Sequence, residues 1–384
     1  MAAVATFGAP AVAGHRLEAI GYASIAGFAE DDLRTAFETF RTSCAAMASG
    51  APELRRGKPA SAALQDICRA ALDADVSTIS AARAFFETHF QPWRIHPMDA
   101  DGREQRGFLT GYYEPVVAAS KKRTPDFTTP ILSRPPDLVT LDPGEDMGAL
   151  SGLAAARRRP DGGLEPYADR AAIETGAIDD RTEAIAWVRD PIERFIIQVQ
   201  GSARLRWPDG SEARLTYSGR NGLPYTSIGR ALVEEGKMTA ERMSLAALKQ
   251  WVRDHGQDEG AEGLALMRRN RSFVFFALGP VDGAGKGPIG AAGVPLAPLR
   301  SIAVDRSLWS YGLPFWISAD LPWRGAEKSA FQRLMIAQDT GSAILGPARA
   351  DLFFGSGDEA GARAGDIRHP GEMIVLLPRH QSAP

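Results

Sequence analysis

Residues 337–357 read AQDTGSAILGPARADLFFGSG, and this stretch indicates both the fold and the chemistry of the chain. Asp339 ends one apolar run, and Asp351 begins another twelve residues later. Gly341 and Gly346 between them predict a strand, a turn and a second strand. A carboxyl group at the end of an apolar strand is partly desolvated, which raises its pKa toward the range that a general acid needs. The alternative is that aspartates beside glycines only form turns.

Asp305 is a third aspartate in the same kind of setting. The apolar run 301–304 leads directly into it, and the segment LWSYG follows at 308–312. Three strands that each meet an aspartate can converge at one end of a small barrel. We therefore expect Asp305, Asp339 and Asp351 to lie near one another.

Composition is that of an ordinary globular protein. The 384 residues predict two or three domains, with 44% hydrophobic and 24% charged residues. A net charge of −3 provides no basic field for nucleic acid or for an anionic membrane. No stretch approaches the ~18 apolar residues of a membrane-spanning helix. The histidines form no HxxxH or HExxH pattern, so we expect no metal and no cofactor.

The start of the chain and its cysteines bear on the compartment. Residues 1–14 are small and apolar, but they lack the basic start of a signal peptide and hold no cysteine for lipid attachment. Cys44 and Cys68 lack the spacing of a zinc site. An oxidising compartment would allow a Cys44–Cys68 disulfide, but we expect buried free thiols.

Apolar stripes at helical spacing predict helices over 30–48, 60–74 and 79–90, which form a helical region before residue 105. Further helices are expected over 169–174, 229–236 and 243–255. Strands are expected over 107–117, 128–132, 184–188, 194–205, 212–217, 271–278, 299–318, 332–340, 350–355 and 373–377. Pro208-Asp209-Gly210 predicts a hairpin turn after the strand at 194–205. In that strand Gln198 and Gln200 share a face, where their amides suit sugar hydroxyl and acetamido groups.

The strand at 107–117 contains an unusual Tyr-Tyr-Glu before a proline. Alternation places Thr110, Tyr112 and Glu114 on one face and Tyr113 on the other. Adjacent tyrosines point to opposite faces, so we expect at most one in the core. The other tyrosine, together with Glu114, would face solvent or a ligand, as in many sugar sites. The alternative is a tyrosine that caps the edge of a sheet.

Several blocks together resemble the membrane-bound lytic murein transglycosylase A family. They are GYYEP at 111–115, QVQGS at 198–202, YSG at 217–219 with NG at 221–222, YTSIG at 225–229, and the three-aspartate segment. The blocks follow the family order and cover roughly residues 105–378. The resemblance implies a mainly β protein with α-helices: a double-psi β-barrel over 1–115 and 271–384, and an inserted β-rich glycan-binding domain over 116–270. It also implies a groove between the two for the glycan strand.

The family's single catalytic acid corresponds to Asp351, with Asp339 beside it to tune or orient it. The implied reaction cleaves the β-1,4 bond between N-acetylmuramic acid and N-acetylglucosamine without water and leaves a 1,6-anhydro end. Asp305 is implied as a structural or supporting member of the substrate site. The full set of substrate-binding residues implied by the matching blocks is Thr110, Tyr112, Tyr113, Glu114, Gln198, Gln200, Ser202, Tyr217, Asn221, Tyr225, Ser227 and Asp305.

The resemblance also bears on location and partners. It implies a periplasmic protein, associated with the outer membrane in many relatives, although this chain shows no lipid-attachment cysteine. The partner is the peptidoglycan glycan strand, other cell-wall enzymes are further candidates, and we expect a monomer. Two alternatives remain open. One is a hydrolase that uses Asp351, Asp339 and water; the other is a glycan-binding protein without activity, because a fold alone does not determine function.

Overall fold

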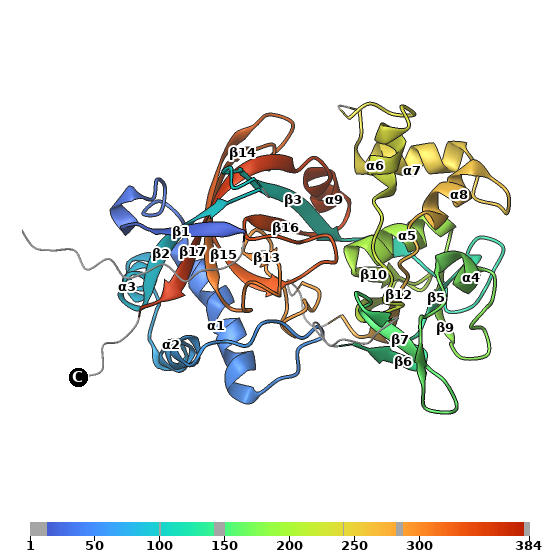
Figure 1. The fold of residues 1–384 in the computed structure, drawn as a ribbon, viewed down its shortest axis with the longest axis horizontal. Coiled ribbons are helices and arrows are strands. Elements are labelled where there is room, and N and C mark those ends of the chain that lie inside the picture. Colours follow the sequence, from blue (N-terminus) through green and yellow to red (C-terminus); the bar gives the residue numbers. More distant parts are fainter. Residues whose placement is uncertain (1–13, 100, 142–149, 241, 282–286, 380–384) are drawn as a thin grey trace, which may run out of the picture. The chain divides into compact units, whose positions relative to one another are not determined.

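The computed structural model describes residues 14–99, 101–141, 150–240, 242–281 and 287–379, so the expectations for residues 1–13 lie outside the described residues. The chain folds into two compact units (Figure 1). The first contains residues 1–112, 289–355 and 366–384, and the second contains residues 113–288 and 356–365. Each unit therefore combines segments that lie far apart in the sequence.

Six strands close into a barrel in the first unit. In order around the ring they are β17 (Arg368–Pro378), β14 (Pro314–Leu321), β15 (Ser329–Asp339), β13 (Ser301–Ala303), β16 (Arg349–Ser356) and β3 (Gly107–Glu114), which pairs again with β17. The strands β1 (His15–Ala19) and β2 (Phe90–Pro97) extend the sheet from β17. A short 3₁₀ turn, η1 (Tyr22–Ser24), follows β1. The predictions of a mainly β protein and of a small barrel are confirmed.

A pair of glycines allows the barrel to close. Gly107 of β3 lies opposite Gly371 of β17, and a Cβ atom on Gly107 would lie 2.6 Å from the carbonyl oxygen of Gly371. Any side chain at Gly107 would therefore push the two backbones apart. The close approach holds β3, which carries Thr110 and Tyr112, in the wall of the barrel.

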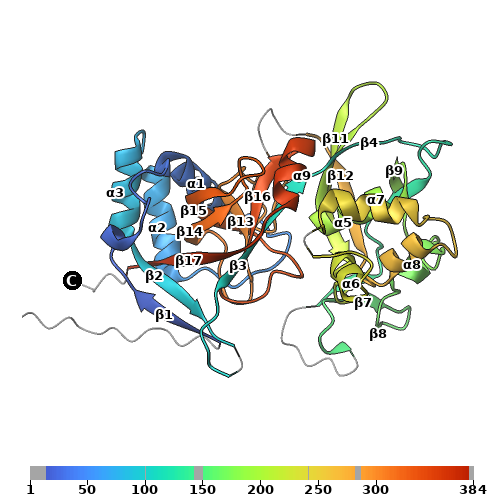
Figure 2. The same cartoon turned by 90° about the horizontal axis from the view of Figure 1, so that it is seen from above.

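Three helices pack side by side in the first unit (Figure 2): α1 (Leu33–Ser49), α2 (Ala62–Asp73) and α3 (Ile79–His89). Each is preceded by a capping residue whose side chain accepts a hydrogen bond from a backbone N–H in the first turn: Asp32, Ser61 and Thr78. Such caps satisfy donors that have no partner within the helix. The helices expected over 30–48, 60–74 and 79–90 are confirmed.

Cys44 of α1 and Cys68 of α2 form a disulfide. The expectation of buried free thiols is wrong. The two helices pack so closely that the Cα atoms of the cysteines are 4.7 Å apart, which is within the range that a disulfide bridges. A separation of 24 residues in the sequence could not reveal this distance.

A buried polar network joins α1 to the strand that ends at Asp339. The amide nitrogen of Gln338 donates to the Thr39 carbonyl oxygen at 3.1 Å and to the Ser43 hydroxyl at 2.8 Å. The Ser301 hydroxyl donates to the other end of the same amide at 2.5 Å. Gln338 is fully buried, so these bonds satisfy groups that water cannot reach. They fix the residue immediately before Asp339.

The second unit contains three small sheets. A four-stranded sheet has the order β12 (Val274–Gly279), β11 (Glu212–Arg220), β10 (Ser202–Arg206) and β4 (Val116–Ala118). The other two sheets are β5 (Thr129–Leu132) with β9 (Ala184–Val188), and β6 (Leu138–Thr140) with β7 (Ala155–Arg158) and β8 (Leu164–Glu165). The helices are α4 (Arg170–Glu174), α5 (Pro191–Gln200), α6 (Ile228–Glu234), α7 (Leu245–Asp254), α8 (Glu262–Arg268) and α9 (Asp358–Gly365).

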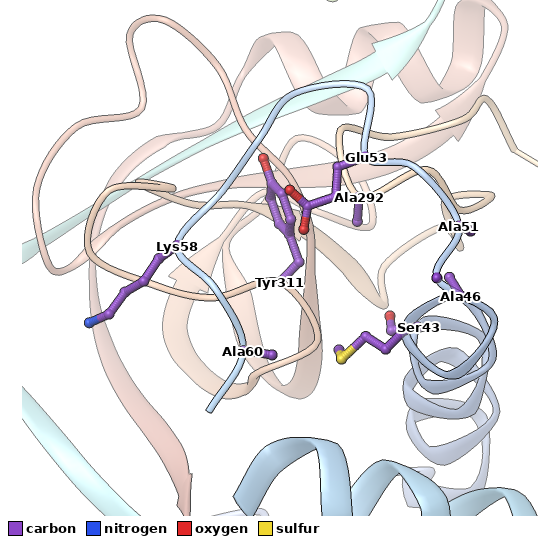
Figure 3. A pocket seen from close by; sticks show the side chains of 10 residues that line it. Ser43, Ala46, Ala51, Glu53, Lys58, Ala60, Ala292 and Tyr311 are labelled. Atoms are coloured by element: carbon purple, nitrogen blue, oxygen red, sulfur yellow. The ribbon is translucent and has the colours of Figure 1, made fainter. Parts of the chain in front are cut away.

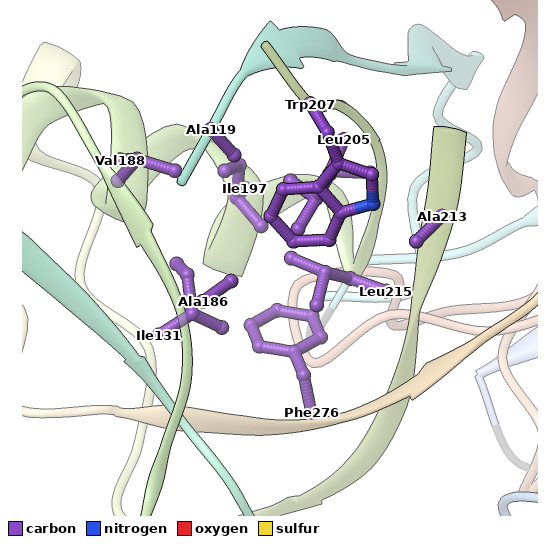
Figure 4. Packing of buried hydrophobic residues seen from close by; sticks show 11 residues of the cluster. Ala119, Ile131, Ala186, Val188, Ile197, Leu205, Trp207, Ala213, Leu215 and Phe276 are labelled. Atoms are coloured by element: carbon purple, nitrogen blue, oxygen red, sulfur yellow. The ribbon is translucent and has the colours of Figure 1, made fainter. Parts of the chain in front are cut away.

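One hydrophobic core of the second unit joins two of its sheets to α5. Figure 4 shows Trp207, Leu215 and Phe276 facing Ile131 and Ile197, all of them buried. The apolar side chains thus come from β11, β12, β5, α5 and the residue after β10, and they exclude water from one shared interior.

The single strand expected over 194–205 is wrong in its first half, because residues 191–200 form α5. The Asp190 carboxylate accepts a hydrogen bond from the Glu193 N–H at 3.0 Å, Pro191 occupies the first turn, and Gly201 ends the helix with φ 80°. This is the sequence signature of a helix start and stop. The strand begins only at Ser202. The hairpin of β10 with β11 is confirmed, with Arg206 opposite Glu212.

Candidate active site

The barrel brings Asp339 and Asp351 to the two sides of one short strand. Asp339 ends β15 and Asp351 lies in β16, and both strands pair with β13. Ala303 of β13 is the register partner of each aspartate. Two carboxyl groups twelve residues apart in the sequence therefore lie on strands that flank the same residue. Both residues are partly exposed to solvent.

Asp339 is held by three hydrogen bonds. Its Oδ1 accepts from the backbone N–H groups of Ala291 at 2.9 Å and Thr340 at 2.8 Å. Its Oδ2 accepts from the Tyr112 hydroxyl at 2.9 Å. Burial raises the pKa of the Asp339 carboxyl, and these three bonds lower it in part. Asp339 therefore has a fixed orientation with both oxygens engaged by the protein.

Asp351 has fewer described partners. Its Oδ1 accepts a hydrogen bond from the Thr110 hydroxyl at 2.5 Å. Burial raises the pKa of the Asp351 carboxyl; the Arg349 charge and the Thr110 bond lower it, and the charge of Asp339 raises it again. The net direction is upward, which keeps the carboxyl protonated at a higher pH than an ordinary aspartic acid. A carboxyl group that stays protonated in a partly exposed residue can act as a general acid.

Strand β3 supplies two of the predicted site residues at alternate positions. Thr110 bonds to Asp351 and Tyr112 bonds to Asp339. The Tyr112 ring packs on Phe353 of β16, with ring centroids 5.3 Å apart. Burial, and the two nearby carboxyl groups, raise the pKa of Tyr112 well above its ordinary value, so its hydroxyl remains a donor.

Asp305 supports the loop between the two carboxyl groups. Its Oδ2 accepts from the Gly346 N–H at 2.8 Å, and its Oδ1 accepts from the backbone N–H and the hydroxyl of Ser307 at 3.0 and 2.6 Å. The Asp305 side chain is buried. It therefore fastens the segment 340–348, which joins Asp339 to Asp351.

Both adjacent tyrosines are buried, at 8% exposure for Tyr112 and 5% for Tyr113. The expectation that at most one enters the core is wrong, because both rings are covered: Tyr112 packs on Phe353 and Tyr113 lies against Gly361. Tyr113 belongs to the second unit, where its ring lies against Gly361 of α9 and its N–H donates to Gln200 at 3.0 Å. Burial raises the pKa of Tyr113 to about 12.

Glu114 does not face solvent. Its side chain is fully buried, with Oε1 2.6 Å from Arg214 Nε and Oε2 accepting from the Ser356 hydroxyl at 2.5 Å. Arg204 adds a longer contact at 3.4 Å. The expectation that Glu114 lies beside a solvent-facing tyrosine is therefore wrong: the sequence could not show that two arginines converge on it.

The amide side chains predicted for sugar binding serve the protein's own backbone. Gln198 Nε2 donates to the Val274 carbonyl oxygen at 3.0 Å. Asn221 is fully buried, donates to the carbonyl oxygens of Ala168 and Arg271, each at 2.9 Å, and accepts from the Phe273 N–H at 2.9 Å. Gln198 and Gln200 do not share a strand face, because α5 replaces the strand.

The remaining predicted residues of the second unit lie on β10, β11 and the start of α6. Ser202 is buried at the beginning of β10, opposite Thr216 in the register. Tyr217 and Tyr225 are half-buried, and the Ser227 hydroxyl caps α6 by accepting from the Arg230 N–H at 3.3 Å. The two tyrosines and Ser227 keep exposed surface.

One residue beside the carboxyl groups was missed from the sequence. The Arg349 guanidinium of β16 donates to the Thr110 hydroxyl oxygen at 2.8 Å. The available signal was its position, two residues before Asp351, which places both side chains on the same face of a strand.

A separate cavity of about 270 Å³ lies between the end of α1, residues 50–60 and Tyr311 (Figure 3). Its described lining contains none of the predicted site residues. In the described part of the chain, no three His, Cys, Asp or Glu side chains are grouped in a way that could hold a metal ion. Within the same residues, no helix combines the length and the apolar character needed to cross a membrane.

Comparisons with known proteins identify the family. A family model described as "MltA specific insert domain" matches residues 108–277, and one described as "3D domain" matches residues 300–377. The membrane-bound lytic murein transglycosylase A of Escherichia coli K12 is 34% identical over 292 residues, covering 74% of this chain and 68% of that protein. The chain belongs to the membrane-bound lytic murein transglycosylase A family.

Solved structures of this family share the fold. A membrane-bound lytic murein transglycosylase from Agrobacterium tumefaciens has a TM-score of 0.82 at 35% identity, covering 94% of this chain and 98% of that one. Escherichia coli MltA with bound chitohexaose has a TM-score of 0.61 at 28% identity, covering 94% and 92%. Asp305, Asp339 and Asp351 all fall within the 3D-domain match, and Thr110 and Tyr112 fall within the insert-domain match.

Proposed function

We propose that this protein is a peptidoglycan lytic transglycosylase in which Asp351 is the single catalytic acid and base. The reaction cleaves the β-1,4 bond between N-acetylmuramic acid and N-acetylglucosamine. Curated relatives bear the name lytic murein transglycosylase, and family membership supports the same reaction class here. The observation that carries the residue assignment is the partly exposed, desolvated Asp351 carboxyl, whose Oδ1 is held by Thr110.

In the first step Asp351 acts as the acid. It gives its proton to the bridging oxygen while the bond from that oxygen to C1 of the muramic acid residue breaks. The glucosamine residue leaves with a hydroxyl group, and C1 takes on oxocarbenium character. Burial favours the neutral carboxyl before this step, since it disfavours the charged form.

In the second step the ionised Asp351 acts as the base. It takes the proton from the C6 hydroxyl of the same muramic acid residue, the C6 oxygen attacks C1, and a 1,6-anhydro ring closes. Attack within one sugar benefits from high effective molarity, so no activated water is required. An ordinary glycosidase needs two carboxyl groups for these tasks. Here the proton returns to Asp351, and one carboxyl completes the cycle.

We assign Asp339 a supporting role. Its negative charge raises the pKa of Asp351, and its three hydrogen bonds keep it in place while the substrate changes. Strand β3 contacts both carboxyl groups: its Tyr112 hydroxyl donates to Asp339, and its Thr110 hydroxyl donates to Asp351.

The proposed substrate is the glycan strand of peptidoglycan, a choice supported by the chitohexaose bound to the Escherichia coli relative. We carry Thr110, Tyr112 and Asp305 forward as the frame of the catalytic end. Tyr217, Tyr225 and Ser227 are the candidate sugar contacts of the inserted domain, proposed over 116–270, since they retain exposed surface. Ser202 and Gln200 are weaker candidates, and the bonds of Gln198, Asn221, Glu114 and Tyr113 favour structural roles.

Finer features of the fold and location complete the proposal. We propose a double-psi connection in the barrel, an N-terminal helical region, a monomer, and a periplasmic location with association to the outer membrane. The curated relatives are named as membrane-bound. The Cys44–Cys68 disulfide supports an oxidising compartment such as the periplasm.

The test is a digest of purified peptidoglycan sacculi by the wild type and by Asp351→Asn, with products identified by mass spectrometry. We expect 1,6-anhydro products from the wild type and none from the variant. Products heavier by one water would indicate a hydrolase, with Asp339 as the base to examine. Absence of soluble products from the wild type, together with retained binding to sacculi, would indicate a glycan-binding protein.

A further inference from the structure

Arg349 makes a set of contacts that the reaction as described above does not use. It lies on β16, and its Nη2 atom donates to the Thr110 hydroxyl oxygen at 2.8 Å. Its Nη1 atom donates to the Ala350 carbonyl oxygen at 2.6 Å and reaches the Phe108 carbonyl oxygen at 3.4 Å. The guanidinium also lies over the Phe108 ring, 5.2 Å from its centroid. These contacts hold the side chain in one orientation beside the catalytic carboxyl.

The hydrogen-bond chemistry gives this contact a direction. A guanidinium only donates, so the Thr110 oxygen must accept from Arg349. A hydroxyl has a single hydrogen, and that hydrogen is then available to the neighbouring carboxyl. The distance of 2.5 Å from Thr110 Oγ1 to Asp351 Oδ1 fits a bond donated by Thr110. The chain of donors therefore runs from Arg349 through Thr110 to Oδ1 of Asp351.

We propose that Arg349 is a positioning residue for the reaction: it fixes the Thr110 hydroxyl as a donor to Oδ1 of Asp351 and so makes Oδ2 the oxygen that exchanges the proton with the substrate. Among the described residues, the hydrogen bond to this carboxyl ends on Oδ1. An oxygen that already accepts a bond from Thr110 is the poorer site for the acidic proton. Without Arg349, the Thr110 hydroxyl could rotate and accept from either carboxyl oxygen, and the proton would be divided between them. This inference rests on the proposed function.

Charge adds a second effect of the same residue. The charged or titratable groups that face Asp351 are Arg349 on its own strand, Asp339 on β15 and Tyr112 on β3. The positive charge of Arg349 lowers the pKa of Asp351, opposing burial and the charge of Asp339. Removal of that charge is expected to raise the pKa of Asp351. Because the acid must be protonated, the fall of activity at high pH then moves to a higher pH.

The experiment is a double-mutant cycle on the full chain with Arg349→Met, Thr110→Val and the double variant. Rates of anhydro-product release are measured across pH, and Arg349→Lys is included because it keeps a positive donor. Arg94→Met is the matched control, since Arg94 is a partly exposed arginine on β2 that pairs with Glu372. Thermal unfolding of each variant separates effects on folding from effects on the reaction.

We expect each single variant to lower kcat by about tenfold, because small misplacements of catalytic groups are costly. The double variant should be no slower than Thr110→Val, since both changes break the same chain of donors. In Arg349→Met the fall of activity at high pH should move to a higher pH. In Arg349→Lys that fall should lie close to its wild-type pH, and Arg94→Met should match the wild type in rate and pH profile.

Two results would overturn the inference while leaving the function intact. One is a multiplicative loss in the double variant, which would mean that Arg349 acts independently of Thr110. The other is Arg349→Met with unchanged kcat and an unchanged pH profile in a wild-type background that makes anhydro products. If Arg349→Met unfolds, Arg349→Gln replaces it in the cycle: a loss of kcat that multiplies with that of Thr110→Val, or an unchanged kcat with an unchanged pH profile, would contradict the inference. A wild type that makes no anhydro products would instead contradict the proposed function.

Discussion

Asp351 and Glu114 are both carboxyl groups on apolar strands, but their two units surround them differently. Glu114 is fully buried, with Arg214 at 2.6 Å, the Ser356 hydroxyl at 2.5 Å and Arg204 at 3.4 Å. Asp351 keeps some exposure, and the bond described for its carboxyl comes from a neutral hydroxyl. The difference indicates that a carboxyl with a complete set of charged partners stabilises the fold. We propose that the Asp351 carboxyl, whose described hydrogen bond comes from the Thr110 hydroxyl, is the one that meets the substrate.

The largest expected effect tests the reactive side of this comparison. Asp351→Asn removes the proton that the reaction needs while preserving shape, so the rate of anhydro-product release should fall by about 10³-fold. Initial rates on sacculi measure the loss, and circular dichroism verifies that the variant is folded. A folded variant that keeps more than a tenth of the wild-type rate would contradict the assignment.

The same chemical change at Glu114 should act on stability instead. Glu114→Gln removes the carboxylate charge that the buried Arg214 and the partly exposed Arg204 contact, so the free energy of unfolding should fall by about 3–5 kcal/mol. Denaturant titration measures it. The control is Glu234→Gln, because Glu234 pairs with Arg230 on the exposed surface of α6 and its loss should cost about 0–1 kcal/mol. An equal loss of unfolding free energy in the two variants would contradict a special stabilising role for Glu114.

Asn221 tests whether a predicted sugar-binding amide supports the fold instead. Asn221→Ala removes three hydrogen bonds to backbone groups and should lower the free energy of unfolding by about 1–3 kcal/mol for each buried group left unsatisfied, such as the Phe273 N–H. Its KM for glycan should stay unchanged. Gln250→Ala, on the exposed side of α7, is the control for stability. A raised KM without lost stability would return Asn221 to the sugar-binding site.

The smallest expected effect is a gain in stability when Asp351 is neutralised, whereas the change at Glu114 lowers stability. The pKa of Asp351 is raised in the folded state by burial, so stability falls as pH rises from the unfolded value, about 3.9, through the folded value. Asp351→Asn removes this titration and should be as stable as the wild type at low pH and more stable at neutral pH. Urea titrations at both pH values measure the difference. The exposed Asp320→Asn is the control, and a variant less stable than the wild type at neutral pH would contradict the sign.

The sequence predicted the barrel and its carboxyl groups because their signals are local. Apolar runs that end at Asp305, Asp339 and Asp351 follow from the spacing of a few residues. Residues 191–200 show a local signal that was interpreted wrongly, since Asp190-Pro191 begins a helix and does not only end a strand. Apart from the Ala350 carbonyl beside Arg349, the described hydrogen-bond partners of the Glu114, Asn221 and Arg349 side chains lie 50 to 242 residues away, and no local pattern predicts such contacts. The disulfide was missed for the same reason.

The most direct test of the account is the titration of the Asp351 carboxyl itself. Aspartate labelled with ¹³C at the carboxyl carbon gives one NMR signal per residue, and the signal absent from Asp351→Asn identifies this group. We expect the pKa of Asp351 to lie above the ordinary aspartate value of about 3.9. In Asp339→Asn that pKa should be lower, because the neighbouring negative charge is lost. An Asp351 signal that titrates at or below the ordinary value would contradict the claim that this desolvated carboxyl is the acid of the reaction.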